Sequence, residues 1–138
     1  MWAVYAILSA LFASATSILA KVGIRDVGSN LATAIRTMVV LVMAWGMVFI
    51  TGQQSEMHKL TEGNNLLFLV LSGIATGLSW LFYFRALQMG EASKVVPIDK
   101  LSVVFTIIMA FMFLHEAPTL KSILGTVLIA VGTLVMVL

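Results

Sequence analysis

Two groups of opposite charge lie inside apolar segments of this sequence, and they are the residues best placed to do chemistry. Arg36 and Asp99 each lie inside an apolar run; at ~1.5 Å per residue Arg36 is roughly 9 Å from the start of its expected helix, and Asp99 is expected at a similar depth. A charge within a hydrophobic helix costs several kcal/mol unless it has a partner or a polar cavity. Three interpretations stay open: a structural salt bridge, a pair that faces a substrate, or two groups that snorkel separately to the membrane surface.

Polar and aromatic side chains repeat at helical spacing beside these charges. Aromatic faces near a carboxylate would suit an organic cation or an aromatic amine. For Thr16, on a face of small residues in the first run, and for the aromatic pair Trp80 and Tyr83, simple helix packing remains the alternative. The candidate substrate-binding residues are Thr16, Arg36, Thr76, Trp80, Tyr83, Asp99 and Ser102.

The composition identifies the environment in which these side chains must lie. Hydrophobic residues make up 61% of the 138 positions and charged residues only 10%, a balance that no soluble domain of this size has. The net charge of +2 is too small to indicate a nucleic-acid partner. The sequence therefore predicts an integral membrane protein with the lipid bilayer as its main partner.

The apolar runs predict an all-α membrane protein with five transmembrane helices in one domain over residues 1–138. Each run is about 20 residues long, the length that crosses ~30 Å of hydrocarbon. Lys21 and Arg25 follow the first run rather than precede it, which favours a transmembrane helix over a cleaved signal peptide. The expected helices lie near residues 2–22, 31–51, 65–87, 95–114 and 120–138. Pro97 lies close enough to the start of the fourth to cost little.

The charges of the loops predict an orientation. An odd number of spans places the two termini on opposite sides of the membrane. More lysine and arginine falls on the side of the first loop than on the other side, which indicates an outer N-terminus and a cytoplasmic C-terminus. The first side receives Lys21, Arg25, Arg85 and Lys94, and the other receives Lys59 and Lys121.

Enzyme chemistry has little support in the sequence. There is no Ser/His/Asp grouping, metal-ligand cluster or phosphate-binding loop, and there are no cysteines. His58 and His115 lie in interfacial loops, away from the embedded carboxylate. We therefore expect no catalytic residues, no metal and no cofactor.

A family resemblance is carried by the second half of the chain. Residues 86–93 (ALQMGEAS), Pro97, Glu116, Gly125 and Gly132 resemble one EamA repeat of the drug/metabolite transporter superfamily. The resemblance covers the whole chain as five helices and is most specific over residues 79–138. Most EamA transporters carry two such repeats in inverted orientation, so this chain resembles the half-size members.

The last helix resembles a dimerisation helix. Residues 125–132 (GTVLIAVG) are similar to the terminal-helix pattern of the small multidrug resistance transporters. The resemblance implies that a second copy docks on Gly125, Leu128, Ile129 and Gly132. It also implies secondary transport of a small metabolite without ATP hydrolysis.

One departure from that related family affects the mechanism. Small multidrug transporters carry a glutamate in the middle of the first helix, where this chain has Ala13, Ser14 and Ala15. Their coupling mechanism therefore does not transfer, and Asp99 is the nearest substitute by its burial alone.

The leading expectation is a secondary active transporter or exporter of a small metabolite or organic cation in a bacterial inner membrane. It would work by alternating access as a homodimer of five-helix units, or with a homologous half-transporter. The alternative is a non-transporting membrane subunit that pairs with another half-transporter. The loop charges favour one orientation whereas an inverted homodimer needs both, so parallel and antiparallel dimers both stay open.

Overall fold

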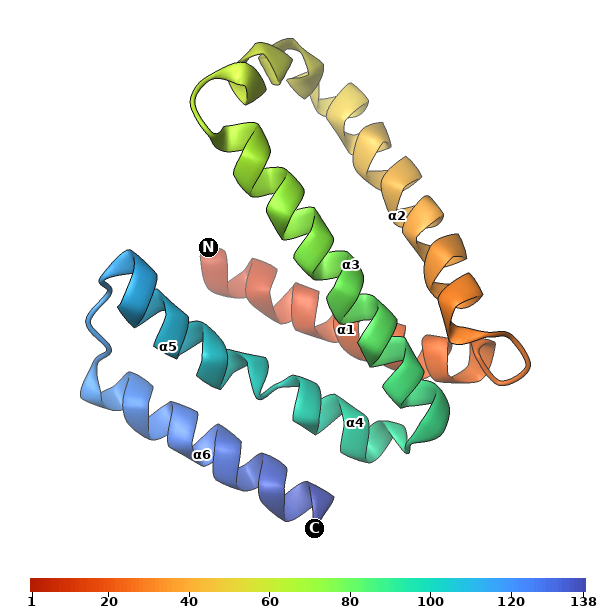
Figure 1. Ribbon diagram of the computed structural model, residues 1–138, viewed down its shortest axis with the longest axis vertical. Helices are drawn as coiled ribbons and strands as arrows, with labels where there is room; N and C mark the ends of the chain where they lie inside the picture. The colour runs from red at the N-terminus through yellow and green to blue at the C-terminus, as the bar shows by residue number, and fades with distance from the viewer. The chain divides into compact units, whose positions relative to one another are not determined.

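The computed structural model describes all 138 residues, and they form helices and turns without strands. Two neighbouring helices, α4 and α5, together have the length of one membrane span, and with the other long helices they give five segments long and apolar enough to cross a membrane. The protein is therefore an all-α membrane protein, as the composition predicted. In chain order the elements are α1 (Trp2–Gly23), α2 (Ser29–Thr51), the 3₁₀ helix η1 (Gln53–Thr61), α3 (Asn65–Met89), α4 (Ala92–Asp99), α5 (Ser102–Leu114) and α6 (Leu120–Val137) (Figure 1).

The chain divides into two compact units. One unit comprises Ala20–Gln88, and the other comprises Met1–Leu19 with Met89–Leu138. Each is described by itself below, as the α2–α3 unit and the α4–α6 unit.

In the α2–α3 unit, η1 joins two antiparallel helices (Figure 1). α2 ends at Gly52, whose φ of +72° lies in the left-handed region that glycine adopts without strain. Its N–H bonds back to the carbonyl oxygens of Phe49 and Val48, which satisfies carbonyls at the helix end. The segment that follows was predicted as a polar break, and the structure adds the 3₁₀ helix within it.

The base of the same unit holds the most deeply buried side chains. Ile24, Phe84 and Leu87 are each at most 2% exposed. The Nε2 atom of Gln88 donates to the carbonyl oxygens of Ile24 at 3.2 Å and Val27 at 3.1 Å. These bonds hold the last turns of α3 against the loop before α2, and so they fix the position of Phe84.

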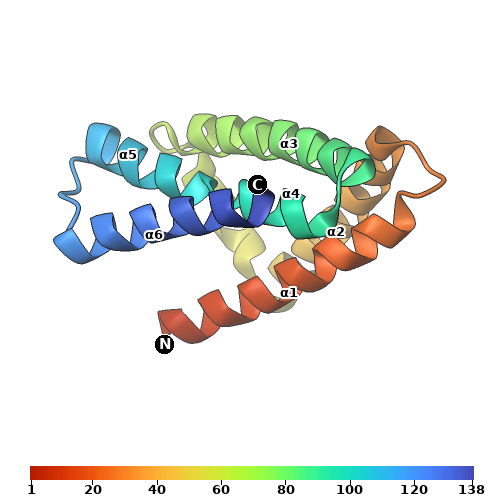
Figure 2. The same cartoon turned by 90° about the horizontal axis from the view of Figure 1, so that it is seen from below.

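In the α4–α6 unit, α6 runs back along α5 and α4 (Figures 1 and 2). The fourth span was predicted as one continuous helix near residues 95–114, and the structure differs in its start and in its continuity. The helix begins at Ala92, and it is interrupted between Asp99 and Ser102. Because of the earlier start, Pro97 lies beyond the first turn, where its missing N–H removes a helical hydrogen bond.

The interruption is a short stretch of tighter helix. The N–H groups of Leu101, Val103 and Val104 each bond to the carbonyl oxygen three residues earlier, at 2.9–3.1 Å. Such 3₁₀ spacing inside a longer helix often marks a hinge or a strained segment. The fourth span is therefore a discontinuous helix.

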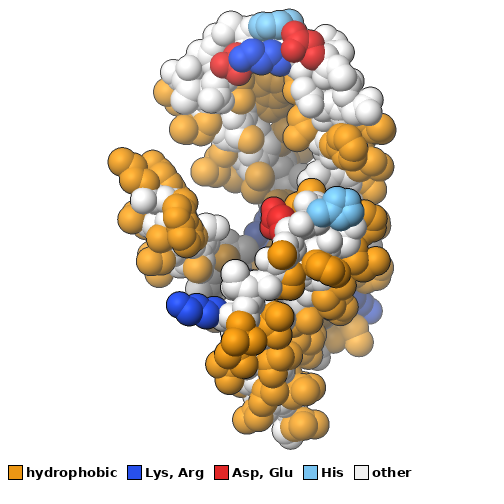
Figure 3. Space-filling model, turned by 90° about the vertical axis from the view of Figure 1, so that its left-hand side faces the viewer, with side chains coloured by type: hydrophobic (Ala, Val, Ile, Leu, Met, Phe, Trp, Pro, Cys, Tyr) orange, Lys and Arg blue, Asp and Glu red, His pale blue; other side chains and the backbone are white.

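The surface of the chain is largely apolar. Leu128 is 71% exposed and Phe82 is 74% exposed, together with many other large hydrophobic side chains. Hydrophobic side chains cover most of the face in Figure 3, and charged and histidine side chains gather at its top, over η1. Such a surface is stable only where lipid or another protein covers it.

Candidate functional site

The embedded arginine of the α2–α3 unit lies against an aromatic ring. The guanidinium carbon of Arg36, on α2, is 4.0 Å from the centroid of the Phe84 ring on α3. Tyr83 meets Phe84 edge to face, with ring centroids 5.3 Å apart. A guanidinium over an aromatic face is attracted by the ring's quadrupole, more strongly where water is excluded.

One nitrogen of Arg36 is left without a hydrogen bond. The NH1 atom is buried and has no hydrogen-bond partner. The neighbouring hydroxyls of α2 are directed to their own helix: Thr33 donates to the Ser29 carbonyl and Thr37 to the Thr33 carbonyl, both at 2.8 Å. A buried donor without an acceptor is costly, so this nitrogen could gain a hydrogen bond from a ligand.

The remaining candidate residues of α3 follow along the same helix. Trp80 and Tyr83 are half-buried on the side of α3 that also holds Phe84 and Leu87. Thr76 is exposed, and its hydroxyl donates to the Ser72 carbonyl at 2.9 Å. Tyr83, which contacts Phe84, thus lies next to the residue that carries Arg36, Trp80 is one turn further along α3, and Thr76 is one turn beyond that.

The embedded carboxylate of the α4–α6 unit lies at the helix interruption. It was expected inside a continuous helix near its N-terminus, but Asp99 is the last residue of α4. Its Oδ2 atom accepts from Lys100 Nζ at 3.3 Å, with the side chains 37% and 55% exposed. Ser102 opens α5 and is exposed, whereas Thr16 is half-buried on α1.

The predicted pair between Arg36 and Asp99 joins residues of different units, and it stays a prediction. Each charge has a neighbour within its own unit: a ring for the arginine and Lys100 for the aspartate.

The predicted dimer helix α6 presents two different sides. Thr133 is buried, and its hydroxyl donates to the Pro97 carbonyl at 3.3 Å. Of the predicted dimer residues, Gly125 and Gly132 lie roughly a quarter of a turn away from that side and Leu128 lies further round, whereas Ile129, four residues before Thr133, lies close to it. A Cβ atom added at either glycine would meet no atom within 4 Å. That side has room for another helix, and the dimer itself stays a prediction.

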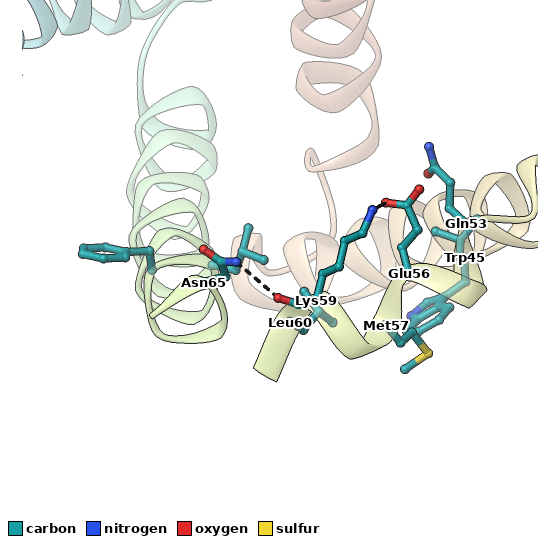
Figure 4. Close-up of a pocket in the computed structure, with 10 residues that line it drawn as sticks. Trp45, Gln53, Glu56, Met57, Lys59, Leu60 and Asn65 are labelled. Carbon is teal, nitrogen blue, oxygen red and sulfur yellow. Dashed lines mark hydrogen bonds and ion pairs between the residues drawn. The ribbon is translucent and has the colours of Figure 1, made fainter. Parts of the chain in front are cut away.

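A cavity that sequence reasoning missed lies where α2, η1 and α3 meet (Figure 4). Its volume is about 650 Å³, with apolar side chains such as Trp45 and Phe68 and a polar edge. At that edge Lys59 pairs with Glu56 at 3.1 Å, and Asn65 donates to the Lys59 carbonyl at 3.2 Å. Trp45 and Phe68, which flank the polar segment between α2 and α3, were the sequence signal available for this cavity.

Three further residues were not singled out as site residues from the sequence. Phe84 lies under Arg36. Gln88 and Thr133 each bond to a backbone carbonyl far away in the sequence. Only their polar character within apolar runs could have drawn attention to the last two.

Five apolar spans with charged groups inside them are features of membrane transporters. The sequence matches the EamA-like transporter family over residues 1–138. The chain therefore belongs to this family, and the resemblance seen in its second half is confirmed.

Two of three similar proteins are named as transporters. The chain is 46% identical over 135 residues to the "Uncharacterized transporter in cobO 3'region" of a Sinorhizobium species, covering 98% of this chain and 95% of the relative. It is 32% identical over 133 residues to the "Uncharacterized transporter YvbV" of Bacillus subtilis, covering 91% of this chain but 42% of that longer relative. It is 30% identical over 77 residues to the "Uncharacterized protein MJ1333.1" of Methanocaldococcus jannaschii, covering 56% of each. No solved structure matches the chain.

The family points to a membrane transporter rather than an enzyme. In the structure, no group of three or more His, Asp or Glu side chains gathers in a way that could hold a metal ion.

Proposed function

We propose that this chain is a secondary active transporter of a small metabolite, which works as a dimer of five-helix units by alternating access in a bacterial inner membrane. The observation that carries the proposal is the discontinuous fourth span, with Asp99 and Lys100 at its interruption.

Interrupted helices have a particular use in membranes. Irregular backbone is tolerated at membrane depth only where protein buries it or where it lines a water-filled cavity. In secondary transporters such interruptions supply helix ends and free carbonyls that bind substrates and ions. Asp99 ends α4 after eight residues, roughly 11 Å from the start of that helix, a depth at which a carboxylate favours a functional role.

The interruption also supplies an element that can move. Alternating access requires a part of the protein with more than one stable arrangement. The 3₁₀ bonds between residues 98 and 104 provide a short segment that can tighten or relax. α6 bonds to its edge through Thr133 and Pro97, so a change in the segment would reach the helix proposed to bind the second copy.

Transport by the purified chain is the decisive measurement. The chain is reconstituted alone into liposomes, and solid-supported-membrane currents are recorded with amino acids, polyamines, nucleosides and quaternary amines. We expect a current with at least one class. Currents that require a homologous half-transporter would instead assign the chain as a non-transporting subunit.

A pair of neutral variants tests the role of Asp99. Asp99→Asn removes the carboxylate at the interruption, and Glu116→Gln removes an exposed carboxylate in the loop between α5 and α6. We expect the first to abolish transport or its pH dependence and the second to leave both unchanged. Equal behaviour of Asp99→Asn and the unmodified chain would exclude Asp99 as the coupling group.

Labelling with a membrane-impermeant thiol reagent tests the orientation. Because the chain has no cysteines, single cysteines at Gln53 and Met89 report the two sides. Reaction of both in intact cells would indicate dual insertion and an antiparallel dimer. Reaction of Gln53→Cys alone would contradict dual insertion.

A further inference from the structure

The two embedded charges are not compensated in the same way within their own units. Asp99 has a cationic neighbour, Lys100, at 3.3 Å. Arg36 has the uncharged face of Phe84, and its buried NH1 nitrogen has no hydrogen-bond partner. The α2–α3 unit therefore carries an embedded positive charge with an unused donor.

The contact with Phe84 positions the Arg36 guanidinium so that its N–H donors could bind a ligand. Phe84 is 2% exposed, and one turn further along α3 Gln88 bonds to the loop before α2. Stacking of a guanidinium on an aromatic face uses none of its N–H donors, and these form a planar fork that matches a carboxylate or a phosphate. Phe84 thus fixes the position of Arg36 without using its donors.

The hydroxyls near Arg36 on α2 are not hydrogen-bond partners of its guanidinium. Thr33 and Thr37 donate to backbone carbonyls of α2 at 2.8 Å. Their hydrogens are already donated to the backbone, and the hydroxyls carry no charge that could balance the guanidinium. A neutral solute could accept the hydrogen bond but would not balance the charge, and a cationic solute would add repulsion, whereas an anionic group supplies both an acceptor and the opposite charge.

From this geometry we infer that the transported solute is a small organic anion, and that its carboxylate or phosphate group pairs with Arg36 above Phe84. The inference rests on the proposed transport function and gives its substrate class. The half-buried faces of Trp80 and Tyr83 would contact the apolar part of such an anion. This differs from the organic cation that aromatic residues beside Asp99 suggested from sequence.

Binding to the purified protein tests the inference without requiring transport. The probes are benzoate, phenyl phosphate and benzyltrimethylammonium, which share a ring and differ in charge. Affinities are measured by calorimetry on the unmodified chain, on Arg36→Gln and Arg36→Lys, and on Arg25→Gln in the exposed loop before α2.

We expect at least one anionic probe to bind the unmodified chain. Arg36→Gln should weaken that binding about tenfold to a hundredfold, since charge-assisted hydrogen bonds are lost. Arg36→Lys should give an intermediate affinity because it keeps the charge but loses the fork. Arg25→Gln should bind as the unmodified chain does. Because Arg36→Gln removes an embedded charge, we expect this variant to fold. Arg36→Lys, which keeps the charge, is a second test of the inference.

Three results would overturn the inference: no binding of either anion, preferred binding of the quaternary amine, or anion binding that Arg36→Gln leaves unchanged. The transport proposal fails separately. If anions bind at Arg36 but the reconstituted chain carries no current, transport fails and the anion site stands. If a cation is transported normally by Arg36→Gln, the anion site fails and transport stands.

Discussion

The hydroxyl of Thr133 on α6 donates to the carbonyl oxygen of Pro97 on α4, at 3.3 Å and across 36 positions of the sequence. In a continuous helix this carbonyl would accept the N–H of Leu101, which instead bonds to Ile98 at 3.0 Å. The Pro97 carbonyl instead accepts the N–H of Lys100 at 3.0 Å, and at the interruption it takes a second hydrogen bond from a side chain of another helix. In lipid, such partners are needed wherever backbone leaves the regular helix.

Replacing Thr133 by valine should destabilise the interruption. Thr133→Val keeps the shape but removes the donor, and hydrogen bonds between membrane helices contribute about 0.6 to 1.7 kcal/mol. We expect a loss of about 1 kcal/mol in the free energy of unfolding in mixed detergent micelles. Hydrogen exchange of the amides near residues 98–104 should become faster.

Thr126→Val is the matched control for that experiment. It removes a hydroxyl from the same helix, but one that donates at 2.8 Å to Ser122 of α6 itself. Its effect on exchange at residues 98–104 should be negligible. Equal effects of the two variants would show that the Thr133 hydroxyl does not stabilise the interruption.

Gln88 should be important for the stability of the α2–α3 unit. Its amide nitrogen donates to two carbonyls of the loop before α2, and its oxygen accepts from Arg85 at 2.8 Å. Gln88→Ala removes all three bonds, so we expect a loss of about 1 to 2 kcal/mol in the free energy of unfolding. Gln54→Ala, in the exposed 3₁₀ helix, is the control and should change it by less than about 0.5 kcal/mol. A loss no larger than that of the control would mean that these bonds exchange freely with water.

Phe84 should be coupled energetically to Arg36. Phe84→Leu keeps an apolar side chain but removes the ring face, and a desolvated cation–π contact is worth about 0.5 to 2 kcal/mol. A double-mutant cycle of Phe84→Leu and Arg36→Gln on the free energy of unfolding should give a coupling of that size. Additive effects would indicate that the 4.0 Å approach contributes no net stability.

The number of spans could be predicted because the thickness of the bilayer fixes the length of an apolar helix. The start of α3 at Asn65 and of α6 at Leu120 agree with the sequence prediction, and α2 begins two residues before its predicted start at position 31. The interruption after Asp99 could not be predicted in the same way, because apolar residues continue on both sides of it. It depends on how far Pro97 lies from the true helix start and on a bond from Thr133.

The site was accessible from sequence only in part. A charge inside an apolar run stands out, so Arg36 and Asp99 could be named as candidates. Their neighbours could not, since cross-helix contacts such as that of Phe84 with Arg36 depend on helix rotation, which a uniformly apolar sequence leaves undefined. α3 is apolar on nearly all sides, and hydropathy therefore does not indicate which of its aromatic rings turns toward α2.

The glycines of α6 allow the proposed dimer to be tested without disturbing the fold of the single chain. A Cβ atom at Gly132 would have no neighbour within 4 Å, so the unit itself should tolerate Gly132→Leu. If a second copy packs closely on this side of the helix, the larger side chain must prevent that approach. We expect the variant to be monomeric in nanodiscs or to have a dimer dissociation constant at least about tenfold higher by single-molecule counting. Val127→Phe adds bulk at an exposed position on a different side of α6 and should leave the dimer intact. Loss of the dimer in both variants would indicate a general effect of bulk on the helix, and a stable dimer of Gly132→Leu would place the interface elsewhere.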